Sequence, residues 1–156
     1  MKKSAGILLY RFKEGDVEFF LVHPGGPFFT KKDKGFWTIP KGEFDEKESP
    51  LLAAKREFLE ETGYQPEGDF VLLNSVIQKG GKKIFCWLAE GDIALDRVQS
   101  NTFELMWPPK SGKVQSFPEI DRAGWFSPQK AKELINERQI PLIDQALSYL
   151  SNKNTN

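Results

Sequence analysis

Three glutamates, Glu57, Glu60 and Glu61, have the spacing that places side chains on one side of a helix. Residues three and four apart are neighbours on a helix surface, so Glu57 repels both of the others. Glu60 and Glu61 also fall in the last turn, where the helix dipole disfavours negative charge. A bound cation would reverse both penalties, and oxygen ligands of this kind suit Mg²⁺, with Mn²⁺ as the alternative. The spacing alone leaves two explanations open, a metal site and a solvated helix face on which Arg56, four residues before Glu60, offsets part of the repulsion.

The residues around these glutamates predict where the helix begins and ends. Ser49 is a natural N-cap and Pro50 suits the first helical position, while Gly63 supplies the left-handed residue that closes a helix. Ala53 shares the side of Glu57, where a small side chain would leave room for a ligand. Apolar residues recur between the two ends at helical spacing and should face the core: Leu51, Ala54 and Phe58.

Residues 42–64 fill every fixed position of the pattern G-x5-E-x7-R-E-U-x-E-E-x-G-U, in which U is a bulky apolar residue. This segment resembles the signature of the Nudix hydrolase family. The resemblance implies an α/β fold, a Nudix-type α/β/α sandwich with a mixed central sheet and a loop-helix-loop catalytic motif. It also implies a pyrophosphohydrolase that cleaves a phosphoric anhydride bond in a nucleoside diphosphate linked to a further group.

The same resemblance implies roles for individual residues. The metal ligands would be glutamates of the helix and the carbonyl oxygen of a glycine: Glu57, Glu60, Glu61 and Gly42. Glu48 and Arg56 would form a supporting pair that orients the catalytic carboxylates. Glu119 would complete the site, because many Nudix sequences carry a catalytic or metal-binding glutamate shortly before a tryptophan, and Glu119 stands six residues before Trp125.

A carboxylate must accept the proton of the attacking water. The sequence leaves this general base open among Glu57, Glu60 and Glu119. Lys41 stands beside the predicted metal site and could meet a phosphate oxygen as a point charge. Trp107 could stack a nucleobase, because aromatic faces accept bases with little preference.

Segments outside the signature resemble the asymmetrical diadenosine tetraphosphate hydrolase branch of the family: residues 4–11, 36–42 and 87–90. Dinucleoside polyphosphates are therefore the favoured substrates. Nucleoside triphosphates, nucleotide sugars and a capped RNA end remain alternatives. A non-catalytic nucleotide-binding module is a further alternative, although such a module would be expected to have lost its metal carboxylates.

Composition limits the partners and the compartment. Twenty-two basic residues balance 22 acidic ones, so nothing in the net charge favours long nucleic acid or anionic lipid. The one cysteine, Cys86, cannot form an internal disulfide, which fits a reducing compartment. No segment approaches the ~18 apolar residues of a membrane span. We therefore expect a cytoplasmic protein that acts on small nucleotides, with its oligomeric state open.

The length of 156 residues predicts one domain over 1–150, followed by a polar, disordered tail at 151–156. Apolar runs predict two hairpins, a last strand and two further helices: 5–12 with 17–23, 70–78 with 82–89, 123–126, 128–137 and 141–150. Residues 24–35 should form a surface loop. Residues 92–118 should form either a substrate-covering insertion or a strand that the sequence does not place.

Overall fold

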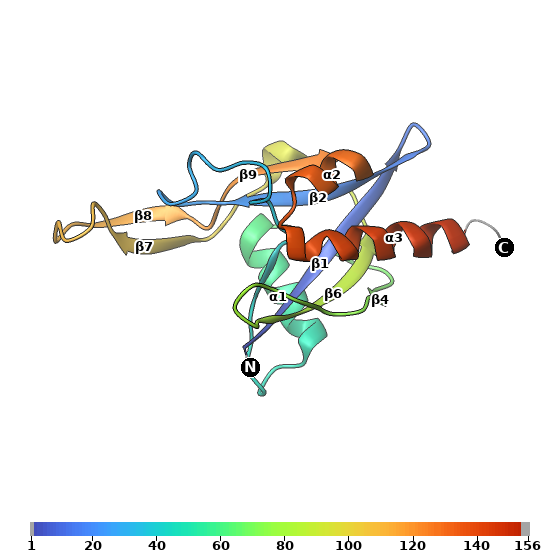
Figure 1. Ribbon diagram of the computed structural model, residues 1–156, viewed down its shortest axis with the longest axis horizontal. Coiled ribbons are helices and arrows are strands. Elements are labelled where there is room, and N and C mark those ends of the chain that lie inside the picture. Colours follow the sequence, from blue (N-terminus) through green and yellow to red (C-terminus); the bar gives the residue numbers. More distant parts are fainter. Residues whose placement is uncertain (1, 154–156) are drawn as a thin grey trace.

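Within residues 2–153, which a computed structural model describes, seven strands form one mixed sheet with helices on both faces (Figure 1). The elements in chain order are β1 (Lys3–Lys13), β2 (Asp16–Pro24), β3 (Lys41–Glu43), α1 (Pro50–Thr62), β4 (Val71–Leu72), β5 (Val76–Ile77), β6 (Lys83–Glu90), the 3₁₀ turn η1 (Leu95–Arg97), β7 (Thr102–Met106), β8 (Val114–Pro118), β9 (Ile120–Phe126), α2 (Pro128–Leu134), the 3₁₀ turn η2 (Glu137–Gln139) and α3 (Ile140–Lys153). The main sheet path runs β4-β6-β1-β2-β9.

The central strand β1 explains why the fold has two cores. It pairs in parallel with β6 and antiparallel with β2 and β3, so the sheet is mixed, as predicted. Its side chains alternate between the faces: Ile7 and Leu9 pack with the residues of α1, whereas Leu8 and Tyr10 pack with those of α2 and α3. A strand covered on both faces reads as a continuous apolar run. The predicted α/β sandwich is confirmed.

Helix α1 begins and ends where the sequence predicts. Ser49 Oγ accepts a hydrogen bond from the Leu52 amide at 3.3 Å, and Gly63 adopts a φ of 77° while its amide bonds Leu59 O. The helix buries Ala54 and Phe58 of the predicted face against the sheet, whereas Leu51 of that face is only half-buried, and it buries Ala53 as well. The prediction for Ala53 is therefore wrong: this residue has no exposed surface and packs in the core, where no ligand reaches it.

The first predicted hairpin is confirmed as β1 and β2. The second is interrupted, because residues 70–78 form two short strands, β4 and β5, that both pair antiparallel with β6. Between β4 and β5, the Asn74 amide points away from the sheet and donates a hydrogen bond to Gln145 Oε1 at 2.7 Å. Strand β3 was not predicted, since three residues are too few to show an alternating pattern.

Residues 102–118, which we call the arm, contain a separate hairpin of β7 and β8 (Figure 1). Figure 1 shows the arm projecting from the main sheet, with the loop of residues 24–35 at its root. The segment therefore hides two strands rather than the one that the sequence allowed. Short, mostly exposed strands give little apolar alternation, which explains why they were missed.

The C-terminal elements are shifted relative to their predicted bounds. Strand β9 begins three residues before the predicted start, and α2 ends at Leu134 because Ile135 is extended. Helix α3 reaches Lys153, so it includes the first part of the predicted tail, and residues 154–156 lie outside the described part of the chain. No helix in residues 2–153 is long and apolar enough to cross a membrane.

Candidate functional site

Strand β3 places Gly42 directly beneath the carboxylate of Glu57. Gly42 pairs with Ala5 in the sheet, and a Cβ added to it would lie 2.0 Å from both Cδ and Oε2 of Glu57. No side chain can be added there unless the carboxylate moves. Gly42 and the Glu57 carboxylate, which both belong to the predicted set of metal ligands, are thus neighbours.

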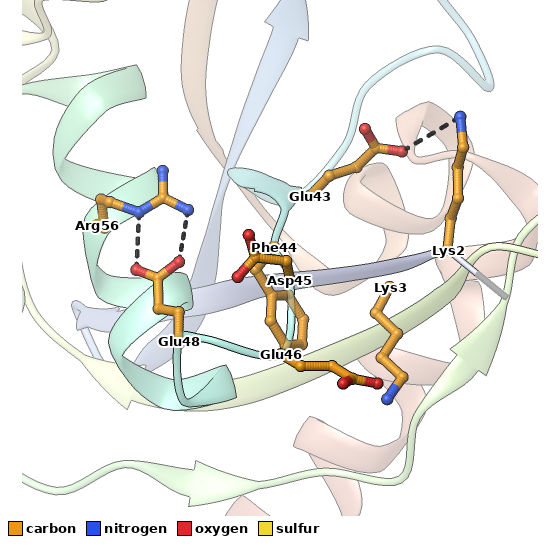
Figure 2. Close-up of a pocket in the computed structure, with 8 residues that line it drawn as sticks. All are labelled: Lys2, Lys3, Glu43, Phe44, Asp45, Glu46, Glu48 and Arg56. Atoms are coloured by element: carbon orange, nitrogen blue, oxygen red, sulfur yellow. Dashed lines mark hydrogen bonds and ion pairs between the residues drawn. The ribbon is translucent and has the colours of Figure 1, made fainter.

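Arg56 connects three of the predicted site residues. Its Nε and Nη2 donate to the two oxygens of Glu48 at 2.8 and 2.9 Å, the paired geometry that Figure 2 shows. Its Nη1 donates to Glu57 at 2.7 Å and to Glu60 at 3.3 Å. The hydrogen bonds that Arg56 donates to Glu48 are the main reason that the pKa of Arg56 is raised. The predicted pair of Glu48 and Arg56 therefore exists, and it holds Glu57 in place.

Glu61 is a buried carboxylate that, among the residues described, has only the more distant charge of Lys41 to offset its own. Its exposed fraction is 7%. Burial raises the pKa of Glu61 well above its ordinary value, and the negative charges of Glu57 and Glu119 raise it further. The Lys41 amide donates a hydrogen bond to it, but within residues 2–153 it forms no ion pair. Buried charges are costly unless they are paired or bind a metal, so this carboxylate indicates a cation site.

Glu119 reaches the site through the backbone at the end of α1. The last carbonyls of a helix lack partners within the helix. Here the Glu60 carbonyl accepts from the Asn101 amide at 2.9 Å, and the Asn101 carbonyl accepts from the Glu119 amide at 2.8 Å. Burial and the charge of Glu60 raise the pKa of Glu119. The fold thus brings Glu119 to the helix glutamates.

The pKa of Glu57 is also raised, mainly by burial and despite its bond to Arg56. In the described residues 2–153, no three acidic, histidine or cysteine side chains lie close enough together to hold a metal ion. One atom of Arg56, Nη1, contacts both Glu57 and Glu60. The oxygen donors, the buried charge of Glu61 and the carboxylate resting on Gly42 nevertheless fit a hard divalent cation.

Lys41 lies beside this acidic cluster. Burial is the main cause that lowers the pKa of Lys41, with Lys82 adding to it, while Glu61, Glu43 and Glu57 act in the opposite direction. Among the described residues its ammonium group forms no ion pair, so it can meet an anionic ligand.

Trp107 lies on the arm, away from the glutamates of α1. It lies at the end of β7 on the arm, and its ring contacts Phe28 at a centroid distance of 5.3 Å. The sequence analysis missed both Phe28 and Asn101. Phe28 stood in a segment predicted only as a loop, and Asn101 acts through its backbone, which leaves no signal in the residue type.

A pocket of about 530 Å³ opens beside the site and is drawn in Figure 2. Its lining carries both signs of charge: Lys2, Lys3, Glu43, Phe44, Asp45, Glu46, Glu48 and Arg56. Only the supporting pair, Glu48 and Arg56, belongs to the predicted site. The other site glutamates do not line this pocket, so Arg56 lies between it and the carboxylate cluster.

Residues 1–146 match the NUDIX domain. The Ap4A hydrolase of C. elegans, solved as a binary complex, aligns with a TM-score of 0.65 and 24% identity over 97% of this chain and 99% of that chain. The NUDIX domain of Shewanella oneidensis NrtR, complexed with ADP ribose, aligns with a TM-score of 0.66 and 18% identity over 95% and 87%. A mutT/nudix family protein from Listeria innocua gives 0.64 and 16% over 99% and 96%.

The solved structures share the fold, and the domain match covers nearly the whole chain. Nudix hydrolases generally use divalent metal ions, in agreement with the oxygen donors around Glu61. The chain belongs to the Nudix family and is a hydrolase of phosphoric anhydride bonds.

Proposed function

We propose that this protein is a Mg²⁺-dependent pyrophosphohydrolase that cleaves dinucleoside polyphosphates such as diadenosine tetraphosphate. The observation that carries the metal dependence is the Glu61 carboxylate, which is buried beside Glu57 and Glu119 with no ion pair among the described residues. The resemblance of segments outside the signature to the diadenosine tetraphosphate hydrolase branch supports the substrate class. The shared fold of the C. elegans Ap4A hydrolase agrees with it.

The cation would be held by four glutamates and one carbonyl: Glu57, Glu60, Glu61, Glu119 and the carbonyl of Gly42. When bound, it would neutralise phosphate oxygens and assist the ionisation of a water molecule. The chain itself supplies placement, because Glu48 holds Arg56 and Arg56 holds Glu57. Positioning and charge stabilisation provide most of the acceleration in phosphoryl transfer.

The general base is proposed to be Glu57 or Glu119, with Glu60 as the remaining alternative. A base works best when its pKa approaches the working pH, and the pKa values of Glu57 and Glu119 are both raised. Lys41 is proposed to bind a phosphate oxygen. An anionic phosphate beside it would restore the charge that burial disfavours.

The test is a hydrolysis assay with and without Mg²⁺ on a panel that contains diadenosine tetraphosphate, ATP, a nucleotide sugar and ADP ribose. We expect metal-dependent turnover, fastest on the dinucleotide. Glu60→Gln should abolish turnover while the thermal unfolding curve stays that of a folded protein. Glu133→Gln, which changes an exposed glutamate on α2, is the matched control and should behave as the wild type.

Product identity separates the alternatives. Metal-dependent turnover of ADP ribose and not of the dinucleotide would show that the proposed substrate class is wrong and that the metal-dependent hydrolysis is right. ADP ribose is in the panel because the NUDIX domain of NrtR was solved in complex with it. Absence of any metal-dependent product across the panel, together with nucleotide binding that Glu60→Gln leaves intact, would indicate a binding module instead. The cytoplasmic location stays a prediction.

A further inference from the structure

The arm and the loop of residues 24–35 together expose an aromatic pair that the core does not need. The rings of Phe28 and Trp107 lie 5.3 Å apart at 79°, and 61% of Phe28 is exposed. Neither residue belongs to the two buried clusters. At the same end of the arm, the facing residues Met106 and Val114 are also exposed. Large apolar side chains are thus exposed at this end of the arm, and exposed apolar surface that gathers in one place is typical of a binding surface.

Trp107 also has an unused hydrogen-bond donor. Trp37 donates its indole N–H to Asp33 at 2.8 Å, and Trp125 donates to the Ile93 carbonyl at 2.9 Å. Across residues 2–153, no acceptor takes the indole N–H of Trp107. A ring face with a free N–H at its edge can both stack on a flat heterocycle and hydrogen-bond a ligand.

Hydrogen bonds hold the loop that carries Phe28 against the segment that carries Glu119. At its start, the Gly25 amide donates to the Glu119 carbonyl at 2.8 Å, and a Cβ on Gly25 would lie 2.0 Å from the Pro118 carbonyl oxygen. Farther along, the fully buried ring of His23 lies 2.7 Å from both the Lys32 carbonyl oxygen and Asp121 Oδ1. The aromatic pair is therefore held in a defined position relative to Glu119.

The distance suits a long substrate. The Trp107 amide donates a hydrogen bond to the Lys113 carbonyl, and Glu119 lies six positions after Lys113. An extended chain rises about 3.3 Å per residue, which places that end of the arm roughly 20 Å from Glu119. Phe28 is three residues from Gly25, so its backbone lies within about 11 Å of the root of the arm.

The turn of the arm and the loop of residues 24–35, which carry Trp107 and Phe28, are both positively charged. Residues 107–113 carry two lysines and no acidic residue. The loop adds Lys31, Lys32 and Lys34, and its single acid, Asp33, already accepts from Trp37. The arm strands between Glu119 and this turn carry one acid, Glu104, and no lysine, so the positive charge lies in the two segments that carry the rings, where it can meet the phosphates next to a bound base.

We propose that Phe28 and Trp107 bind the distal nucleobase of the substrate, the base joined to the attacked phosphorus through the longer part of the polyphosphate. This inference rests on the proposed function, because it assigns the second base of a dinucleoside polyphosphate to a site on the arm. It makes the two residues determinants of specificity for two-base substrates over one-base substrates.

The test compares kcat/KM for diadenosine tetraphosphate with kcat/KM for adenosine tetraphosphate, which has the same phosphate chain and one base fewer. Stacking of a base on an aromatic ring contributes about 1–3 kcal/mol, so Trp107→Ala or Phe28→Ala should lower the ratio of the two values by roughly 5- to 150-fold. Trp107→Phe keeps a stacking face and should restore most of the ratio. Phe12→Ala, at an exposed aromatic residue on the β1–β2 hairpin, is the control and should leave the ratio unchanged.

The outcomes separate this inference from the proposed function. If the wild type hydrolyses both compounds and Trp107→Ala leaves the ratio unchanged, the aromatic site is wrong and the proposed function stands. If the wild type hydrolyses neither compound, the proposed function is wrong. In that case, calorimetry compares the binding of diadenosine tetraphosphate to the Glu60→Gln variant and to the double variant that also carries Trp107→Ala. A Kd at least fivefold higher in the double variant supports the aromatic site, and an equal Kd overturns it.

Discussion

Adding one methyl group at Gly42 tests how the Glu57 carboxylate is placed. A Cβ there would lie 2.0 Å from Cδ and Oε2 of Glu57, whereas ordinary contact begins at 3.4 Å, so the carboxylate must retreat by about 1.4 Å. Gly42 does not have a left-handed φ, so alanine is compatible with its backbone. A misplacement of about 1 Å can cost ~100-fold in rate. We expect Gly42→Ala to lower kcat about 100-fold, which corresponds to about 2.7 kcal/mol of barrier.

Stability should change much less than activity. The retreat strains the 2.7 Å bond between Arg56 and Glu57, but Arg56 keeps both bonds to Glu48. Because Arg56 is partly exposed, we expect a loss of about 1 kcal/mol, or roughly 2–4 °C in Tm. Metal-dependent hydrolysis and thermal unfolding are the two assays. Glu43→Ala, on the same strand but without contact to Glu57, is the matched control for activity.

A double variant tests whether the clash with Glu57 causes these effects. In Glu57→Ala protein the clashing atoms are absent, so adding Gly42→Ala should leave Tm unchanged; coupling of this kind is expected for residues in contact. Wild-type kcat and Mg²⁺ dependence in Gly42→Ala would refute the placement of Glu57 on Gly42. The same loss of Tm with and without Glu57 would refute the steric explanation.

Three other predictions concern the charges of the site. Glu61→Gln should raise Tm without metal and weaken Mg²⁺ binding in calorimetry, because it removes a buried charge; a lowered Tm would contradict this. Metal-free protein should lose stability as pH rises above 4.5, because acids with a raised folded-state pKa bind more protons when folded than when unfolded. Tm measured over a series of pH values should show this loss, and Mg²⁺ should reduce it. A metal-free Tm that rises with pH would contradict the prediction. Arg56→Lys should lower kcat at least tenfold with a small change in Tm, because lysine cannot make the paired bonds to Glu48, and unchanged kcat would exclude the orienting role.

Local interactions explain why so much of the site could be predicted. The signature lies within residues 42–64, and the helix caps at Ser49 and Gly63 set the ends of α1 through neighbouring backbone groups. Helical geometry then places the glutamates together without reference to the rest of the chain. The pairing of Glu48 with Arg56 has the same origin, since the two residues are eight positions apart on one loop and helix.

Long-range packing explains what could not be predicted. Ala53 fits either a ligand-facing or a core position by its size, and only the packing of α1 on the sheet decides for the core. The strands of the arm have too few buried positions to show a period. The contact between Phe28 and Trp107 joins residues far apart in sequence, and no local pattern indicates which loop will meet which strand.

The sequence by itself determined the family and the acidic helix with its bounds, and it predicts the residues that are proposed to hold a cation. Those features depend on residue type and on contacts within one loop and one helix. The tertiary structure decided that Glu119 joins them, because its position depends on backbone hydrogen bonds from the end of α1 through Asn101. It also decided where Trp107 lies, since the arm and the loop of residues 24–35 meet only when the sheet brings β2 beside β9.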